Sequence, residues 1–273
     1  MTARQKPGIE LELWPAGNPP GFDKGLGAPL PRLVAYLAKS KRVHGAVVIC
    51  PGGGYGGQAA HEAEPIARWL NGLGLSAFVL YYRVAPYRHP VPLADAQRAI
   101  RVVRDQAARW SVAPDRIGIL GFSAGGHLAA SAGVHHALIA YAPVDRADRK
   151  SPRPDFMILC YPVISFGPHG HRGSMENLLG VKPGKALRRM LSLETTVDAT
   201  TPPAFIWHTA SDGGVPVENS LLLASALSRN RVAFALHVFP DGAHGLGLAE
   251  SQPAVRAWTS LCGEWLKGIV GRP

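Results

Sequence analysis

Ser123 has the sequence setting of a catalytic nucleophile. It is the central residue of Gly121-Phe-Ser-Ala-Gly, which directly follows a short apolar run and opens a stretch with helical character. Glycines on both sides of a serine permit the strained strand-to-helix turn that lifts a hydroxyl out of a sheet edge. A glycine-rich packing turn is the alternative for the pentapeptide alone, and the flanking elements favour the nucleophile. The chemistry predicted is attack of a serine oxygen on an acyl carbon.

Such a serine needs a base, and histidine, which titrates at a pH of about 6.5, is the usual one. Among the 11 histidines, His244 follows the last strand-like run, where this order of elements places the base. Asp212 follows the preceding run and lies between nucleophile and base in the chain, as the third member must. Asp241 is the rival, although its place three residues before His244 favours a turn.

Backbone amides that could stabilise an oxyanion follow an earlier apolar run, in Pro51-Gly-Gly-Gly-Tyr. Successive glycines let N–H groups approach a ligand without obstruction by Cβ atoms. We expect the amides of Gly53, Gly54 and Ala124 to form the oxyanion hole, each contributing on the order of 3 kcal/mol to lowering the barrier. A phosphate-binding loop is the alternative. The Gly-Lys-Ser/Thr ending of a P-loop is missing, and we expect no dinucleotide fingerprint here.

The elements that must position these residues alternate along the chain. Strand-like runs rich in β-branched and aromatic residues are residues 43–50, 76–82, 117–120, 156–161, 204–209 and 233–239. Stretches with helical spacing of apolar residues are 62–73, 93–109, 124–133, 217–230 and 254–270. Because strands covered on both faces are continuously apolar, this alternation predicts an α/β fold with a mostly parallel sheet between two helical layers.

One segment departs from the alternation. Residues 165–201 begin with a Gly/Pro-rich stretch and contain two short helical pieces, 175–179 and 185–193, which together suggest a lid-like insertion over the sheet. No repeat or long linker divides the 273 residues, so we expect one domain over 1–273 after a Pro/Gly-rich lead-in at 15–31.

Charge and hydropathy argue against polyanion and membrane binding. The net charge is +10, but the basic residues are scattered and are not interleaved with aromatic residues, so we expect no nucleic-acid partner. Residues 117–144 carry no formal charge over 28 positions, which is longer than the roughly 20 residues that span a bilayer. Five glycines and three histidines interrupt this stretch and indicate a buried strand, a turn and a buried helix instead.

The cysteines and the N-terminus indicate a reducing compartment. Cys50, Cys160 and Cys262 lie in apolar runs and are too few for a disulfide framework. No apolar segment follows the first eight residues, so we expect no secretory leader and a cytoplasmic location. His169 and His171 are the only close histidine pair with a gap, and no further ligand lies near them in sequence, so we expect neither a metal nor a cofactor.

Taken together, these motifs resemble the α/β-hydrolase superfamily, in particular bacterial acetyl xylan esterases and BD-FAE-like carboxylesterases. The resemblance runs from about Glu10 to Leu266. The motifs that carry it are Cys50-Pro-Gly-Gly-Gly-Tyr, Gly121-Phe-Ser-Ala-Gly-Gly-His-Leu, Arg153-Pro-Asp-Phe, Tyr161-Pro-Val-Ile-Ser, Asn177-Leu-Leu-Gly, Thr201-Pro-Pro-Ala-Phe and Gly242-Ala-His-Gly. It implies an α/β-hydrolase fold, with Ser123, Asp212 and His244 as nucleophile, acid and base. Pro51 departs from the pattern, because many related esterases have histidine there to support the oxyanion hole.

The expectation is a metal-free serine carboxylesterase that removes short acyl groups, acetyl first, through an acyl-enzyme. Its substrate would be a small-molecule or oligosaccharide ester, such as an acetylated xylan fragment. Tyr55, Phe122 and His171 are candidates to line the acyl or alcohol side. A peptidase or amidase of the same fold is the alternative, although the propeller domain usual in prolyl-oligopeptidase-like peptidases does not fit this length. A non-catalytic binding module on the same fold is the second alternative.

Overall fold

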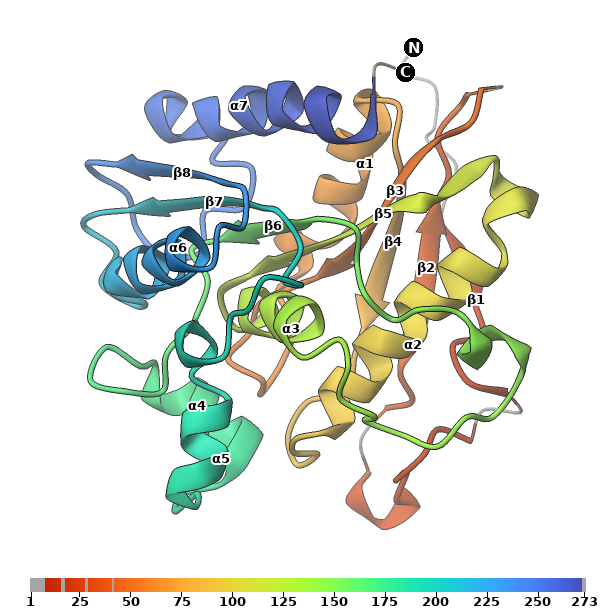
Figure 1. The fold of residues 1–273 in the computed structure, drawn as a ribbon, viewed down its shortest axis with the longest axis horizontal. Coiled ribbons are helices and arrows are strands. Elements are labelled where there is room, and N and C mark those ends of the chain that lie inside the picture. The colour runs from red at the N-terminus through yellow and green to blue at the C-terminus, as the bar shows by residue number, and fades with distance from the viewer. Residues whose placement is uncertain (1–7, 16–17, 28, 41, 272–273) are drawn as a thin grey trace.

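An eight-stranded sheet forms the centre of the computed structural model, in the order β1-β2-β4-β3-β5-β6-β7-β8 (Figure 1). The structure describes residues 8–15, 18–27, 29–40 and 42–271. The strands are β1 (Ile9–Leu11), β2 (Arg32–Tyr36), β3 (His44–Cys50), β4 (Ser76–Tyr81), β5 (Val112–Phe122), β6 (Met157–Cys160), β7 (Ala204–Thr209) and β8 (Phe234–Phe239). Strand β2 is antiparallel to β1 and β4, and the neighbours from β4 to β8 pair in parallel. The carboxyl ends of β3, β5, β7 and β8 therefore meet at one edge.

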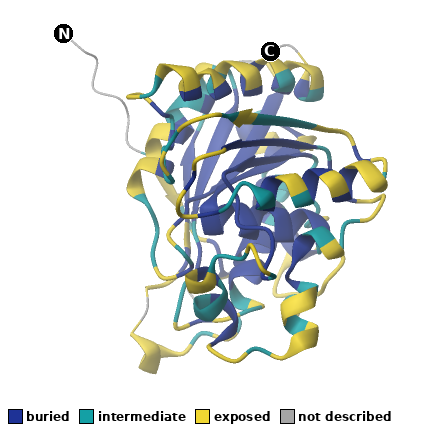
Figure 2. Ribbon diagram, turned by 90° about the vertical axis from the view of Figure 1, so that its left-hand side faces the viewer, coloured by how far each residue is buried: buried dark blue, intermediate teal, exposed yellow. Residues whose placement is uncertain are grey.

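Two helical layers cover the sheet. Helices α1 (Glu64–Gly72) and α7 (Pro253–Val270) pack on one face, whereas α2 (Val91–Asp105), α3 (Ser123–Val134) and α6 (Glu218–Arg229) pack on the other (Figure 1). Figure 2 shows the buried strands between helices that expose only their outer sides. Helix α3 differs because all of its residues are buried, as its mostly small and apolar sequence allows.

Short 3-10 helices fill the connections at Lys24–Leu26, Ala60–Glu62, Ala107–Trp110, Arg146–Arg149 and Leu193–Thr195. The turn at Ala60–Glu62 matters for the site because it lies between the glycine-rich loop after β3 and the start of α1.

The predicted parallel sheet and its two helical layers are confirmed. All six expected strands and all five expected helices are present, with β5 longer than residues 117–120 and the segment 93–109 divided into α2 and a 3-10 turn. Strands β1 and β2 were not predicted, because they are short, lie at an antiparallel edge and flank the Pro/Gly-rich lead-in. Residues 1–7, on which the absence of a leader depends, lie outside the described residues.

The uncharged stretch 117–144 forms the end of β5, a sharp turn and helix α3. No helix in the described part of the chain is long and apolar enough to cross a membrane. The three cysteines are free and buried in the core, as expected.

The insertion at 165–201 contains α4 (Arg172–Leu179) and α5 (Lys185–Met190), which lie below α3 and α6 in Figure 1. Its start is fixed by the Asn219 side chain, whose Oδ1 accepts hydrogen bonds from the amides of Ile164 and Ser165. Asn177 Nδ2 donates to the Gly54 carbonyl at 2.9 Å. The insertion therefore contacts the glycine-rich loop directly, and a lid function for it stays a prediction.

A buried ion pair joins the segment that follows β4 to helix α2. Arg83 and Asp95 have fully buried side chains, with Arg83 Nη2 2.8 Å from Asp95 Oδ1 and Arg83 Nε 2.9 Å from Asp95 Oδ2. Trp14 Nε1 donates to the same carboxylate at 2.8 Å, which anchors the segment after β1. Burial raises the pKa of Asp95, and the hydrogen bonds from Arg83 oppose that rise.

Arg83→Met should destabilise the fold by roughly 3 to 5 kcal/mol, because it leaves a carboxylate buried without a cation. The deficit should grow as pH rises, since the charged form of Asp95 carries the penalty and its pKa is raised. Urea unfolding at several pH values measures both effects. The double variant Arg83→Met/Asp95→Leu should recover part of the loss, and a double variant no more stable than the single one contradicts this account.

Candidate active site

Ser123 forms the predicted strained turn between β5 and α3. Its φ is +52°, in the left-handed region that non-glycine residues rarely adopt. A Cβ on Gly121 would lie 2.0 Å from the Gly125 carbonyl oxygen, and one on Gly125 would lie 2.1 Å from the Cys50 carbonyl oxygen. Only glycine fits at either position, so the structure confirms that the flanking glycines permit the turn.

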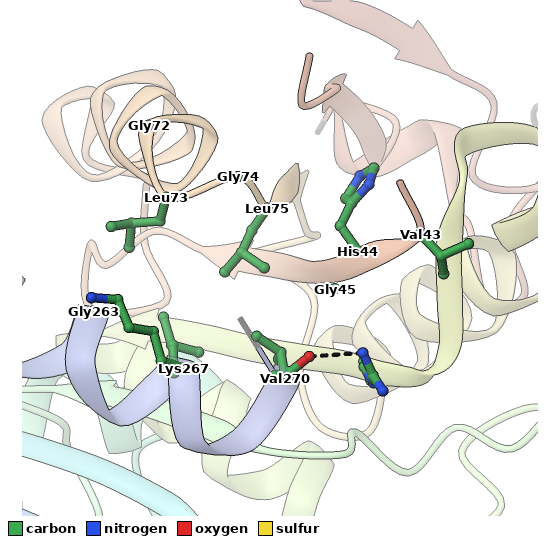
Figure 3. A pocket seen from close by; sticks show the side chains of 13 residues that line it. Val43, His44, Gly45, Gly72, Leu73, Gly74, Leu75, Gly263, Lys267 and Val270 are labelled. Atoms are coloured by element: carbon green, nitrogen blue, oxygen red, sulfur yellow. Dashed lines mark hydrogen bonds between the residues drawn. The ribbon is translucent and has the colours of Figure 1, made fainter. Parts of the chain in front are cut away.

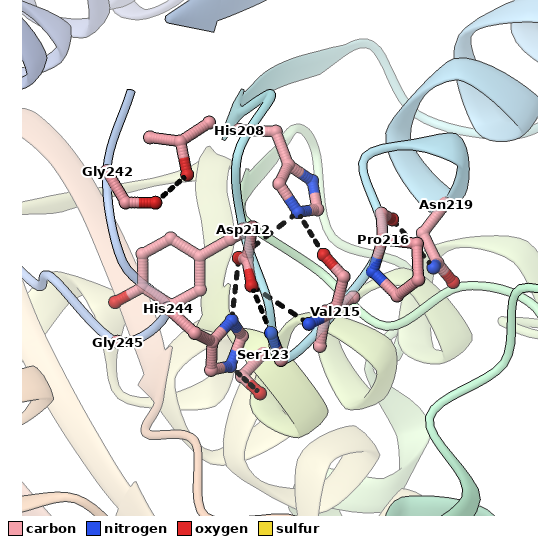
Figure 4. A network of polar contacts seen from close by, with 12 residues as sticks. Ser123, His208, Asp212, Val215, Pro216, Asn219, Gly242, His244 and Gly245 are labelled. Carbon is pink, nitrogen blue, oxygen red and sulfur yellow. Dashed lines mark hydrogen bonds and ion pairs between the residues drawn. The ribbon is translucent and has the colours of Figure 1, made fainter. Parts of the chain in front are cut away.

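The three predicted triad residues meet at the carboxyl edge of the sheet (Figure 4). His244 Nε2 lies 2.8 Å from Ser123 Oγ, and His244 Nδ1 lies 2.7 Å from Asp212 Oδ2. These distances suit hydrogen bonds in which Nδ1–H donates to the carboxylate and Nε2 accepts the serine proton. The arrangement can therefore deprotonate the hydroxyl as it attacks.

Asp212 is held in its ionised form. Its Oδ1 accepts hydrogen bonds from the amides of Gly214 and Val215 at 2.8 and 2.9 Å. His208 Nε2 lies 3.4 Å from Oδ2 and 2.9 Å from the Val215 carbonyl oxygen (Figure 4). Burial raises the pKa of Asp212, but the hydrogen bonds from His208, His244 and the Val215 amide outweigh it and bring the pKa well below its usual value. The carboxylate can therefore orient His244 and stabilise its positive charge.

Hydrogen bonds between two loops hold this geometry. Thr209 Oγ1 donates to the Gly242 carbonyl at 2.8 Å, and the Gly242 amide donates to Ser211 Oγ at 3.0 Å. These contacts join the loop of Asp212 to the loop of His244. The rival Asp241 has an exposed position, and the carboxylate that meets the His244 ring is that of Asp212.

The glycine-rich loop packs against the nucleophile. A Cβ on Gly52 would lie 3.1 Å from Ser123 Cβ, so the loop approaches as closely as glycine allows. Gly53 and Gly54 have φ values of +134° and +64°, which turn successive amides along the loop. The Ala124 amide lies in the first turn of α3, where an N–H has no acceptor within the helix. The candidate donors Gly53, Gly54 and Ala124 thus lie on the two segments that flank Ser123.

The glycines at positions 52, 54 and 57 do match the spacing Gly-x-Gly-x-x-Gly, so the expectation that this pattern is absent was wrong. In a dinucleotide site the last glycine opens a helix whose N-terminus faces the phosphates. Here a 3-10 turn intervenes, and α1 begins only at Glu64. The loop instead faces Ser123.

Two of the three expected substrate-lining side chains do not lie at the site. Tyr55 is 1% exposed, and its hydroxyl bonds His127 Nδ1 at 2.9 Å in the core. Phe122 is fully buried against Tyr161 and Trp258. The reason for Phe122 is that side chains alternate along a strand, so Phe122, like Leu120, points from β5 into the core on the α1 and α7 side of the sheet.

His171 lies near the triad. It is half-buried at the start of α4, where its ring bonds the Ser174 amide and hydroxyl at 3.1 and 2.8 Å. Burial lowers the pKa of His171, and the nearby His244 lowers it further. Of the three expected lining residues, His171 alone keeps a position consistent with that role.

Three buried polar residues around the triad were not predicted. They are Glu62, Tyr161 and His208. His208 lies inside the predicted strand 204–209, and its position four residues before Asp212 was the signal that it could support the acid. Glu62 and Tyr161 are 99 positions apart in sequence, so no local pattern connects them.

A hollow of about 230 Å³ lies between the C-terminal ends of α1 and α7 (Figure 3). It is lined by His44 and Gly45 at the start of β3, whereas the glycine-rich loop follows the end of that strand. This hollow is therefore remote from the triad. Within the described ranges, no group of three or more His, Cys, Asp or Glu side chains is arranged to hold a metal ion.

Comparison with known proteins identifies the family of this chain. A family model described as BD-FAE matches residues 34–227. The chain is 40% identical over 227 residues to endo-1,4-beta-xylanase B of Butyrivibrio fibrisolvens, and 34% identical over 231 residues to an acetylxylan esterase of Xylanibacter ruminicola. Each match covers 82% of this chain but only 36% and 45% of the relative, so the chain spans less than half the length of these curated proteins.

Solved structures show the same fold. An acetyl ester-xyloside bifunctional hydrolase from Caldicellulosiruptor lactoaceticus is 48% identical with a TM-score of 0.92, covering 96% of this chain and 97% of that one. A carboxylesterase from Lactobacillus plantarum is 28% identical with a TM-score of 0.73, covering 88% of this chain and 94% of that one. The predicted α/β-hydrolase fold is therefore confirmed.

Asp212→Asn should slow labelling of Ser123 by a fluorophosphonate by roughly 10³-fold or more, because the amide no longer fixes His244 with Nε2 free to accept a proton. Mass spectrometry of the labelled peptide over time gives the rate. Asp241→Asn is the matched control and should label at the wild-type rate. Equal effects of the two substitutions would contradict the assignment of Asp212 as the acid.

Proposed function

The chain belongs to the BD-FAE family and has the α/β-hydrolase fold, and from that premise we propose that it is a serine carboxylesterase. Its relatives support a carboxylic ester hydrolase in general. The finer proposal is that it removes short acyl groups, acetyl first, from hydroxyl groups of small molecules or oligosaccharides. The observation that carries the serine mechanism is the continuous line of hydrogen bonds from Ser123 Oγ through His244 to Asp212, beside a glycine-rich loop.

The proposed reaction has two halves. Ser123 Oγ attacks the ester carbonyl carbon while His244 Nε2 takes its proton, and Asp212 stabilises the charged imidazole. The amides of Gly53, Gly54 and Ala124 donate to the oxyanion. His244 then returns the proton to the departing alcohol, which leaves an acyl-enzyme. Water attacks the acyl carbon in the same way, releasing the carboxylic acid and restoring Ser123.

Acetylated carbohydrate is the substrate class that the similar proteins favour. One relative is an acetylxylan esterase, and one solved structure is that of an acetyl ester-xyloside hydrolase. We propose that His171 and the start of the insertion line the side where the alcohol leaves, because His171 is the lining candidate near His244. The proposed reaction requires no cofactor.

Ser123→Ala should reduce hydrolysis of 4-nitrophenyl acetate to the rate of the buffer blank plus any surface-catalysed background. The nucleophilic oxygen is removed while the buried surroundings, in which Ser123 is 8% exposed, are kept. Release of 4-nitrophenol measures the rate. Equal rates for the variant and the wild type would remove the proposal.

An acyl-chain series should show kcat/KM highest for acetyl and falling steeply beyond four carbons. We expect this because the similar proteins include an acetylxylan esterase and an acetyl ester-xyloside hydrolase. Acetylated xylo-oligosaccharide and a matching acetamide serve as comparison substrates. Rapid release of acetate from the oligosaccharide with no cleavage of the amide supports an esterase, whereas preferred cleavage of the amide would indicate the amidase alternative.

A further inference from the structure

Glu62 is a buried carboxylate directly behind the glycine-rich loop. It is 2% exposed and ends the 3-10 turn at Ala60–Glu62. Its Oε2 accepts a hydrogen bond from the Gly52 amide at 2.7 Å, and its Oε1 accepts one from the Tyr161 hydroxyl at 2.6 Å. Both oxygens are therefore occupied by donors from different parts of the chain.

The first donor fixes the entry to the oxyanion loop. The same turn also holds the other end of Gly52, since the Ala59 amide donates to the Gly52 carbonyl at 2.9 Å. With its amide directed at Glu62, Gly52 is not an oxyanion donor. The peptides that follow, at Gly53 and Gly54, start from a residue fixed at both its N–H and its carbonyl.

The second donor, the Tyr161 hydroxyl, also contacts the loop that carries His244. Tyr161 follows β6, and its hydroxyl accepts a hydrogen bond from the Gly247 amide at 2.8 Å while donating to Glu62. Its ring meets the His244 ring edge-on, with centroids 5.1 Å apart. His61 adds a parallel contact, because its Nε2 lies 2.8 Å from the Gly245 carbonyl oxygen. The turn thus holds the chain on the C-terminal side of His244 at two points.

We infer that Glu62 is a positioning residue that sets the oxyanion loop and the His244 loop relative to Ser123 through one carboxylate. The inference rests on the proposed esterase function. It also answers the question raised by Pro51, where related esterases have histidine. The Pro51 carbonyl accepts a hydrogen bond from the Tyr82 hydroxyl at 2.7 Å, and Glu62 secures the next residue.

A purely stabilising role is a weaker explanation of Glu62. Burying a carboxylate costs free energy, and the basic side chain recorded beside it is that of His61, whose Nε2 lies 3.6 Å from Oε1. Burial raises the pKa of Glu62, and the bonds from Tyr161 and Gly52 only partly offset that rise. An apolar side chain would fill such a site at lower cost, whereas only an acceptor with two oxygens can bond Gly52 and Tyr161 together.

Three variants test the inference. Glu62→Ala removes both acceptors, Glu62→Gln keeps one acceptor for Gly52, and Tyr161→Phe cuts only the arm toward His244. Glu64→Gln is the matched control, since Glu64 is exposed and begins α1 two residues further on. The measurements are kcat and KM for 4-nitrophenyl acetate, the rate of fluorophosphonate labelling, the fraction of titratable Ser123 and the thermal midpoint.

We expect kcat per titrated site to fall about 100-fold in Glu62→Ala and about 10-fold in Glu62→Gln and Tyr161→Phe, because a displaced oxyanion donor or base costs rates of this order. KM should stay within about twofold and Glu64→Gln should match the wild type. The partial rescue by glutamine distinguishes positioning from a general loss of stability. If Glu62→Ala does not fold, the kcat values of Glu62→Gln and Tyr161→Phe still test the inference.

Wild-type kcat per titrated site in folded Glu62→Gln and Tyr161→Phe would overturn the inference. The inference would also be overturned if the loss of activity in these variants were explained entirely by a smaller fraction of molecules with titratable Ser123. The labelling rate separates this inference from the proposed function. A wild type that labels rapidly but hydrolyses no ester would refute the esterase proposal, while the labelling rates of the variants would still report on Glu62.

Discussion

The left-handed turn at Ser123 is the constraint on which the rest of the site depends. A non-glycine residue at a φ of +52° costs on the order of 1 to 3 kcal/mol, and it persists only where the surroundings fix it. Here β5 is paired on both sides by β3 and β6, and the helix that follows is buried along its whole length. The absence of Cβ atoms at Gly121 and Gly125 lets this helix start against the end of β3. The same crossing brings the loop after β3 to the nucleophile.

Two buried carboxylates surround this turn, and their different partners give them different roles. Asp212 receives hydrogen bonds from two backbone amides and from His244, with His208 close by, and its pKa falls well below the usual value. Glu62 receives two donors and its pKa is raised by burial. The first is therefore suited to stabilising positive charge on the base during reaction. The second is suited to holding polypeptide segments in place, because its two oxygens bond the glycine-rich loop and Tyr161.

The sequence was sufficient to predict what is encoded locally. Continuous apolar runs predicted the strands from β3 to β8, and glycine-flanked polar residues after them predicted Ser123, Asp212 and His244. The direction of a side chain was less accessible, so Phe122 was expected at the site although strand alternation turns it into the core. Glu62 was missed because a carboxylate gains its role from Tyr161, 99 residues away. A one-dimensional pattern carries no signal for such a pair.

The walls of the site differ in how firmly they are held. On one side, Glu62 and Tyr82 fix the residues that lead into the oxyanion loop from beneath. On the other, the insertion contributes Asn177, whose amide donates to the Gly54 carbonyl, and it contributes His171 near the base. Because loops tolerate change better than the strands and buried turns that support them, we expect the proposed acyl transfer to depend on the first wall. In the proposed esterase, we expect changes in the insertion to alter the choice of alcohol without displacing the triad.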